Sequence, residues 1–449
     1  MRPKVHPSSF TLHLSFFLSM SNIKILGFGT RGDVQPVLAL AKSLQRAGHV
    51  VTMVAGDNFG AWIQSHDVQF APIGTDIQAM MSSKDGVAWV EGNQFTQQIY
   101  MRRLFSSIAQ KMHRNVWEHS TGADLLLGSF TSDGVGMAVA EKRGIAYATL
   151  ALQPLRPTRL GTSTYMAVRP NAESIFNKLS GRMGEFVLWS TFGGLLNESR
   201  RELGLLPHTL KSYTAAQHKL ITLHGYSQYV APKPVDWAKH WHITGYWFLD
   251  APSTSLNTTD EAYSGLSPQL KAFLQAGSPP IYIGFGSATD RNARATTQMI
   301  MRAIQICGQR AIVSQGWAGL TADLSTLPKE QVCIIDSAPH AQLFLHTAGV
   351  VHHGGAGTTG TAFAAGVPQF VIPHFAEQPY WGRRTYELGV GVRPVAKQRL
   401  SDINLASGIT RMVSDPALKA KAAQLAAFIK KEDGVNKAVH FINDIIAKA

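Results

Sequence analysis

Cysteine is nearly absent from this chain of 449 residues, in which only Cys307 and Cys333 occur. So few cysteines exclude a disulfide-stapled scaffold and a cysteine-based metal site. Both lie in apolar stretches, which indicates buried free thiols in a reducing compartment. The sequence therefore predicts a cytoplasmic protein.

Long apolar runs are also missing. No run of about 18 consecutive apolar residues occurs, so no transmembrane helix is predicted. The first residues resemble a signal peptide, because Arg2 and Lys4 precede the apolar stretch FTLHLSFFLSM. However, His13 interrupts this stretch and no small-residue cleavage site follows. We therefore interpret residues 1–19 as a mis-assigned start or a leader, with Met20 as the start of the folded chain.

Acidic residues are scarce, with 29 Asp and Glu against 42 Lys and Arg, a net charge of +13. The sequence has neither basic clusters interleaved with aromatic residues nor a recognisable nucleic-acid module, so a nucleic acid is not expected as a partner. Two interpretations of the charge stay open. One is peripheral contact with the anionic headgroups of a membrane, and the other is a solvated basic surface.

Residue patterns that bind metal ions are absent as well. No Asp-x-Asp pair occurs, and none of the 17 histidines forms an i, i+4 pair with a third ligand nearby. These absences remove the usual carboxylate pair for Mg²⁺ or Mn²⁺ and the usual spacing for zinc. We expect no metal and no cofactor.

What the sequence does have is a regular alternation of strands and helices. Apolar strand segments at 23–28 and 49–56 flank an amphipathic helical segment, and a second such series begins at 279–287. Strands separated by helices require crossover connections, hence parallel sheets. A chain of this length exceeds one hydrophobic core, so two domains of about 200 residues each are expected.

The fold class predicted is therefore α/β, with two Rossmann-like domains. A composition shift rich in Tyr, Trp and Pro, followed by the polar stretch DAPSTSLNTTD, places the linker within 225–280. The last segment has one apolar helical face. The predicted units are an N-terminal domain at 20–240, a C-terminal domain at 241–430 and a terminal helix at 431–449.

Residues 349–378 are the most informative stretch of the chain. A short strand runs into the glycine-rich turn HHGGAGT, a helix of small residues follows, and a second strand leads to Glu377 and Gln378. Glycine lets backbone N–H groups approach an anion, and the helix N-terminus adds its positive dipole. His353 can donate to the same anion. This layout indicates a site for a sugar diphosphate; the alternative is an ordinary strand-to-helix turn with buried histidines.

The stretch resembles the donor-binding motif of the family 1 nucleotide-sugar glycosyltransferases, most closely the sterol glucosyltransferases and the related antibiotic glycosyltransferases. His353, Gly355 and Thr358 keep the spacing of the first part, and Glu377-Gln378 supply the second. The resemblance implies a GT-B fold, in which two Rossmann-like domains face a cleft. The N-terminal domain would bind the acceptor and the C-terminal domain the donor, and the final helix would pack back onto the first domain.

The loop after the first strand, GFGTRGDVQP at 27–36, resembles a signature of the same enzymes. The resemblance implies that Asp33 takes the proton from the acceptor hydroxyl, while Thr30 and Arg31 face the donor. Asp33 would then need partial burial to raise its pKa. The alternative is that Asp33 only caps the following helix.

The remaining donor-site residues are also implied by the resemblance. Ser287 follows a glycine turn and mirrors the Asp33 loop in the second domain; its hydroxyl could bond a phosphate, and the alternative is a plain turn residue. Ala338 and His340 match a segment that holds uracil through backbone atoms. The stacking tryptophan of that segment is replaced by Ser337. His353 is expected to act in catalysis on the diphosphate together with the amides of Ala356, Gly357 and Thr358, without a metal. Glu377 and Gln378 are expected to bind the sugar hydroxyls.

The acceptor side is less specific. The segments 95–117 and 183–205 could line an apolar acceptor pocket, touch a membrane, or face the core. Asp133 is interpreted as a helix N-cap rather than a second catalytic carboxylate.

The function predicted is an inverting transfer of a hexose, glucose from UDP-glucose, to a hydroxyl of a hydrophobic acceptor such as a sterol or lipid. Alternatives that stay open are the same chemistry on a polyketide, glycopeptide or hydroxy-fatty acid with a dTDP- or UDP-sugar, a nucleotide-sugar epimerase, and an inactive sugar-nucleotide-binding protein.

Overall fold

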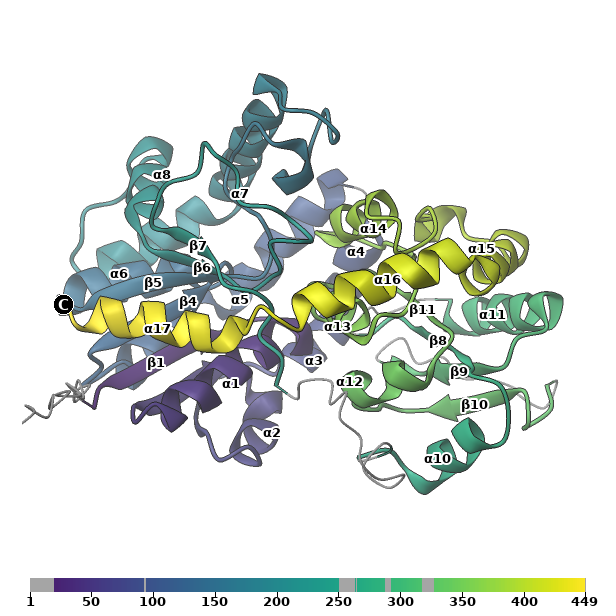
Figure 1. Ribbon diagram of the computed structural model, residues 1–449. Helices are drawn as coiled ribbons and strands as arrows, with labels where there is room; N and C mark the ends of the chain where they lie inside the picture. The colour runs from purple at the N-terminus through teal and green to yellow at the C-terminus, as the bar shows by residue number, and fades with distance from the viewer. Residues whose placement is uncertain are drawn as a thin grey trace, which may run out of the picture.

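The computed structural model describes residues 20–92, 94–249, 263, 265–286, 292–316 and 327–448. It contains two α/β units, each built on a parallel sheet (Figure 1). The predicted fold class is therefore confirmed.

The first unit holds a seven-stranded sheet in the order β3-β2-β1-β4-β5-β6-β7, and every neighbouring pair is parallel. Its strands are β1 (Asn22–Gly27), β2 (Val50–Ala55), β3 (Gln69–Pro72), β4 (Leu125–Ser129), β5 (Ala146–Ala151), β6 (Thr222–His224) and β7 (Trp241–Ile243). Its helices are α1 (Arg31–Arg46), α2 (Gly60–Gln64), α3 (Ile77–Ser82), α4 (Lys84–Glu91), α5 (Gln94–His119), α6 (Asp133–Arg143), α7 (Ile175–Glu202) and α8 (Leu210–Lys219). The sheet extends three residues past the boundary predicted at residue 240.

The second unit holds a five-stranded parallel sheet in the order β10-β9-β8-β11-β12. Its strands are β8 (Ile281–Gly284), β9 (Ala311–Ser314), β10 (Val332–Ile335), β11 (Gly349–His352) and β12 (Gln369–Val371). The helices are α10 (Pro268–Gln275), α11 (Ala293–Cys307), α12 (His340–Leu343), α13 (Ala356–Ala365), α14 (Gln378–Glu387), α15 (Asp402–Ser414), α16 (Pro416–Ile429) and α17 (Gly434–Ile446).

The two sheets share one topology. In each, the first strand of the unit lies beside both the second and the fourth, so the strand order reverses between β1 and β4 and between β8 and β11. Ligands of open α/β sheets bind beyond the carboxyl ends of the strands at this reversal. The loops after β1, β4, β8 and β11 are therefore the places where a site is expected.

The strands are buried because both faces of each sheet are covered. β1 reads NIKILG and β4 reads LLLGS, and almost all of their residues are buried. Apolar residues on both faces of a strand are typical of a parallel sheet between helix layers. None of the described helices is long and apolar enough to cross a membrane.

The last helix connects the units. α17 leaves the second unit after α16 and lies along the first (Figure 1). Ala438, Ile442 and Ile445 are buried in the same hydrophobic cluster as β1 and α1, and the Asn443 side chain is 2.8 Å from the His49 ring nitrogen Nε2. One apolar face at helical spacing accounts for this packing.

An aromatic cluster fills the junction between the units. Tyr226, Trp237 and Trp241 from the first unit pack in one cluster with Tyr380 and Trp381 of α14. The segment interpreted as part of the linker is therefore a folded part of the interface up to residue 249. The polar stretch DAPSTSLNTTD lies outside the described residues.

Candidate active site

Two helix N-termini meet where the units join. α1 of the first unit contacts α13 of the second, and a Cβ added to Gly357 would lie only 3.7 Å from the carbonyl oxygen of Gly32. Each helix follows a glycine turn at the carboxyl end of a strand. Free N–H groups and the positive ends of two helix dipoles therefore converge at one place, which favours an anion.

Asp33 lies in the first turn of α1 and is half-buried. Its Oδ2 accepts the backbone N–H of Thr30 at 2.8 Å and the Thr30 hydroxyl at 3.2 Å. The capping contact considered as the alternative does exist. It leaves the second oxygen, Oδ1, without a hydrogen bond from the described residues, so capping and proton transfer are compatible.

The turn before Asp33 is shaped for this carboxylate. Gly29 has φ of +134°, a conformation that side chains rarely adopt, and a Cβ there would lie 2.3 Å from Asp33 Oδ2. Burial raises the pKa of Asp33 from 3.8 to about 6, against the lowering effect of the Thr30 hydrogen bonds. Asp33 is therefore a stronger base than an exposed aspartate and is still mostly ionised at neutral pH.

Glu377 brings a second carboxylate to the same junction from the other unit. It is half-buried at the N-cap of α14, next to Ala376, which has the left-handed φ of +52°. Burial raises the pKa of Glu377 to about 7, and the charge of Asp33 adds to this shift. Since each carboxylate feels the other, their protonation is coupled.

The two adjacent histidines have different surroundings. His352 is buried, its Nε2 is 2.8 Å from Gln369 Oε1, and its Nδ1 accepts the N–H of Gly354 at 3.1 Å. These contacts place the ring proton on Nε2, and the hydrogen bond from Gly354 lets His352 stabilise the glycine turn.

His353 lies between two glycine turns. A Cβ on Gly286 would approach its Cε1 to 2.8 Å, and one on Gly355 would approach its Nε2 to 2.5 Å. Its buried Nδ1 has no hydrogen-bond partner among the described residues. Burial, together with the neighbouring histidines, lowers the pKa of His353 well below 6.5. A neutral ring with an unused nitrogen is suited to hydrogen bonding with a ligand.

The first turn of α13 completes the anion site. Gly355 is the N-cap, and Ala356, Gly357 and Thr358 follow it, all half-buried. Gly354 has φ of +92° and no room for a Cβ, since Val371 lies 2.7 Å away from where that atom would be. The turn is therefore glycine-rich for a steric reason.

Gln378 is buried, and its Oε1 accepts the N–H groups of His374 at 2.8 Å and Phe375 at 3.2 Å. It fixes the loop that carries Glu377. The binding of sugar hydroxyls by Gln378 stays a prediction. Because Oε1 already accepts two hydrogen bonds, only the amide nitrogen is available to contact a sugar.

The structure also describes Thr30, Arg31, Ala338 and His340, the other predicted donor residues. Arg31 is exposed and lies 4.7 Å above the Trp62 ring. Its charge contributes, after burial, to lowering the pKa of His340 to about 4. His340 Nε2 is 3.0 Å from the Tyr282 hydroxyl. Thr30 and Ala338 are half-buried, and Ser287 lies outside the described residues.

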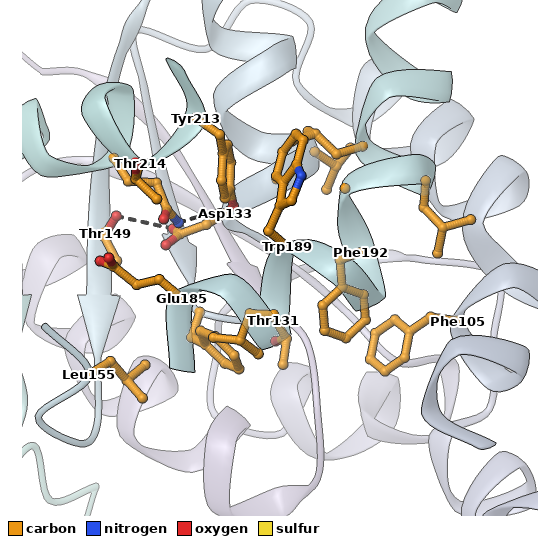
Figure 2. Close-up of a pocket in the computed structure, with 18 of the residues that line it drawn as sticks. Phe105, Thr131, Asp133, Thr149, Leu155, Glu185, Trp189, Phe192, Tyr213 and Thr214 are labelled. Carbon is orange, nitrogen blue, oxygen red and sulfur yellow. Dashed lines mark hydrogen bonds between the residues drawn. The ribbon is translucent and has the colours of Figure 1, made fainter. Parts of the chain in front are cut away.

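A pocket opens beside the β1 loop in the first unit (Figure 2). Its volume is about 1140 Å³ when the open space at its mouth is counted. Phe105 and Met112 of α5, and Trp189, Phe192 and Leu196 of α7, line it. The two segments flagged in the sequence therefore line a pocket.

The pocket is tied to the Asp33 loop through Thr131, a lining residue whose hydroxyl donates to the carbonyl oxygen of Phe28 at 2.7 Å. Asp133 also lines the pocket. It is the first residue of α6, and Ser132 is the N-cap, so the N-cap prediction for Asp133 is wrong. Sequence reasoning missed Arg156 and Tyr213, because nothing local marks them as pocket residues.

No group of three His, Cys, Asp or Glu side chains placed to hold a metal ion occurs within the described part of the chain.

The two units match two known domains. Residues 23–162 match the glycosyltransferase family 28 N-terminal domain, and residues 308–433 match the C-terminal domain of erythromycin biosynthesis protein CIII-like proteins. A solved structure of the calicheamicin glycosyltransferase CalG4 superposes with a TM-score of 0.66 at 16% identity, covering 96% of this chain and 99% of the other. This likeness confirms the GT-B fold.

Sequence relatives extend over nearly the whole chain. A sterol 3-beta-glucosyltransferase of Arabidopsis thaliana is 33% identical over 425 residues, which cover 93% of this chain and 67% of that protein. One of Cryptococcus neoformans var. neoformans is 31% identical over 96% of this chain, which spans only 28% of the fungal protein. The chain belongs to the nucleotide-sugar glycosyltransferase family that includes the sterol 3-beta-glucosyltransferases.

Proposed function

We propose that this protein transfers glucose from UDP-glucose to a hydroxyl of a sterol or a similar hydrophobic alcohol, with inversion at the anomeric carbon and without a metal ion. The observation that carries the proposal is the meeting of Asp33 with the N-terminus of α13 beside an apolar pocket. A base, an anion site and an acceptor site would thus lie close together.

The acceptor hydroxyl would lie against Asp33. As its oxygen attacks the anomeric carbon, the hydroxyl proton passes to the Asp33 carboxylate, and the bond from that carbon to the diphosphate oxygen breaks. Attack from the side opposite the leaving group inverts the configuration. With a pKa of about 6, Asp33 is ionised enough at neutral pH to accept the proton.

The departing diphosphate gains negative charge during this step. The free N–H groups of Ala356, Gly357 and Thr358 and the α13 dipole would stabilise that charge. The neutral His353 ring would donate one further hydrogen bond. These groups would do the work for which other enzymes use a divalent cation, so the proposal includes metal independence.

Glu377 would accept hydrogen bonds from the hydroxyls of the donor sugar. It stands at the start of α14, on the donor side of the junction. Its pKa of about 7 means that it is partly protonated at neutral pH, and hydrogen bonds from sugar hydroxyls would favour the ionised form.

We also propose peripheral contact of this cytoplasmic enzyme with an anionic membrane through the start of α7. Seven large apolar side chains in one segment are 47–63% exposed: Met166, Val168, Ile175, Phe176, Leu179, Met183 and Phe186. Arg169 and Arg182, both exposed, accompany them. Apolar groups edged by basic ones favour an anionic lipid surface. Further along α7, Leu188 and Phe192 line the pocket, so a lipid-borne acceptor would enter beneath this helix.

The catalytic proposal is tested by a panel of donors and acceptors. UDP-glucose, UDP-galactose and dTDP-rhamnose would each be offered with cholesterol, ergosterol, a hydroxy-fatty acid and a polyketide aglycone. We expect transfer from UDP-glucose to the sterols. Preferential transfer to the fatty acid or polyketide would contradict the proposed sterol acceptor. Epimerisation of the sugar without an acceptor would contradict the proposed transferase activity.

The membrane contact is tested by sedimentation with vesicles of phosphatidylcholine containing phosphatidylserine. The double variant Phe176→Asp/Leu179→Asp should lose binding, whereas Ile306→Asp, at an equally exposed position on α11, should keep it. Equal sedimentation of both variants with the vesicles would contradict membrane contact through the start of α7.

A further inference from the structure

The acceptor pocket has a polar side that the transfer reaction does not use. Figure 2 shows Phe192 and Phe105 at one side of the pocket and Asp133 and Thr149 at the other. Trp189 and Tyr213 lie between them, with their ring centres 5.3 Å apart. Arg156 also lines the pocket. A cavity built only for a hydrocarbon skeleton would not need charged groups in its wall, because burying them is costly.

Asp133 has one oxygen committed and one available. It is 2% exposed, and its Oδ1 accepts the Tyr147 hydroxyl at 2.8 Å and the Thr149 hydroxyl at 3.1 Å. Its Oδ2 receives no hydrogen bond from the described residues. Burial raises the pKa of Asp133 to about 6, while the charge of Arg156 and the two hydroxyls lower it. The group is therefore mainly a carboxylate at neutral pH.

Arg156 supplies the complementary donors. It is 7% exposed, its Nη2 donates to the Thr222 hydroxyl at 3.2 Å, and the guanidinium lies 5.4 Å from the centre of the Trp241 ring. A guanidinium has five N–H donors, and the others have no acceptor among the described residues. The polar side of the pocket thus offers both a free acceptor and free donors.

We propose that Asp133 and Arg156 recognise a second hydroxyl on the acceptor, distinct from the hydroxyl that receives the sugar. The inference rests on the proposed function, whose acceptor class it narrows to amphipathic polycyclic diols or polyols. A hydroxyl can donate to Asp133 and accept from Arg156 at once. An acceptor carboxylate would satisfy Arg156 but would face the Asp133 charge, so a neutral group fits better.

A purely apolar acceptor face would leave both groups without partners. Removing a partner from a buried charged group is costly, and sites built to bind a hydroxyl discriminate strongly against the analogue without it. From the strength of hydrogen bonds to charged groups, we expect roughly 10- to 150-fold tighter binding of a matching diol than of the mono-alcohol.

The test measures binding without donor, so that it does not depend on transfer. Tritiated cholesterol and its 7α-, 16α- and 25-hydroxylated forms would each be titrated against the wild-type protein, Asp133→Asn, Arg156→Met and the control Asp236→Asn. Asp236 is a carboxylate bonded to Thr158 and Lys178, outside this pocket. Transfer from UDP-glucose to the same four alcohols would be assayed in parallel.

We expect at least one diol to bind the wild-type and Asp236→Asn proteins at least about 10-fold tighter than cholesterol. The preference should fall to within about threefold in Asp133→Asn and Arg156→Met, with cholesterol binding kept. Equal or no binding of all four alcohols by the wild-type protein would overturn the inference, a result that needs no variant to fold. So would a preference that survives in both pocket variants. A binding preference that depends on Asp133 and Arg156, without any transfer, would reject the proposed function but support recognition of a ligand hydroxyl by this pair.

Discussion

Replacing Asp33 by Asn should change activity and stability in opposite directions. The variant keeps the size of the side chain and an oxygen that can accept the Thr30 N–H. It loses the negative charge and with it the basicity. General-base catalysis contributes roughly 10²–10⁴-fold, so kcat should fall by about that factor while the affinity for UDP changes little.

The stability effect follows from the pKa. Burial raises the pKa of Asp33 from 3.8 to about 6. The folded protein therefore holds this proton more tightly than the unfolded chain, and the stabilisation present below pH 3.8 is lost as the pH rises through about 6. Above pH 6 the ionised carboxylate costs the fold about 1–2 kcal/mol, with its partial exposure allowed for. Because Asn does not ionise, the variant should be more stable by about that amount at pH 7.

The assay is release of UDP between pH 5 and 8, with urea unfolding of the same samples. The wild-type kcat/KM should rise with pH and level off above about 6, and this acidic limb should be missing in Asp33→Asn. Asp57→Asn is a matched control, since the Asp57 carboxylate accepts the N–H of Gly74 in another loop of the same unit. A kcat near the wild-type value together with lower stability would show that Asp33 only caps α1.

Other perturbations separate the remaining roles. His353→Ala should weaken UDP binding by roughly 10- to 150-fold in calorimetry but leave uridine binding unchanged. Equal losses for UDP and uridine in this variant would point to structural damage. His352→Ala should lower the free energy of unfolding by about 1–3 kcal/mol, because it removes a buried side chain that is hydrogen-bonded to the glycine turn. Glu377→Gln should slow transfer from UDP-glucose by about 10²-fold with UDP affinity kept, and an unchanged rate would remove Glu377 from the sugar site. Gly29→Ala should reduce kcat far more than Gly48→Ala, because both glycines have positive φ but only a Cβ at Gly29 meets the Asp33 carboxylate; similar kcat values in the two variants would contradict this placement. Excess EDTA should leave turnover unchanged, and loss of activity restored by Mg²⁺ or Mn²⁺ would reject the metal-free mechanism.

The architecture was predictable because its signals are local. Alternating apolar and amphipathic segments indicated two parallel-sheet units, and both sheets are parallel. The junction was harder to predict. Tyr226, Trp237 and Trp381 are far apart in sequence and meet only when both units are in place, so a segment rich in aromatic residues was read as a linker.

In the candidate site, too, local features could be predicted from the sequence and long-range contacts could not. The glycine turns and the acidic residues that follow them could be located from sequence, because steric demands at Gly29 and Gly354 leave a visible pattern. The separate roles of His352 and His353 could not, since they depend on contacts with Gln369 and the Gly286 turn. The coupling of Asp33 to Glu377 likewise exists only across the two units.

We propose inverting glucosyl transfer to a sterol-like alcohol at the junction of the two units. It is tested most directly by the anomeric configuration of the product formed from UDP-α-glucose and cholesterol, read from the coupling constant of the anomeric proton. We expect a β-linked steryl glucoside with release of one equivalent of UDP. An α-linked product, or free glucose as the sole product with the sterol unchanged, would contradict it.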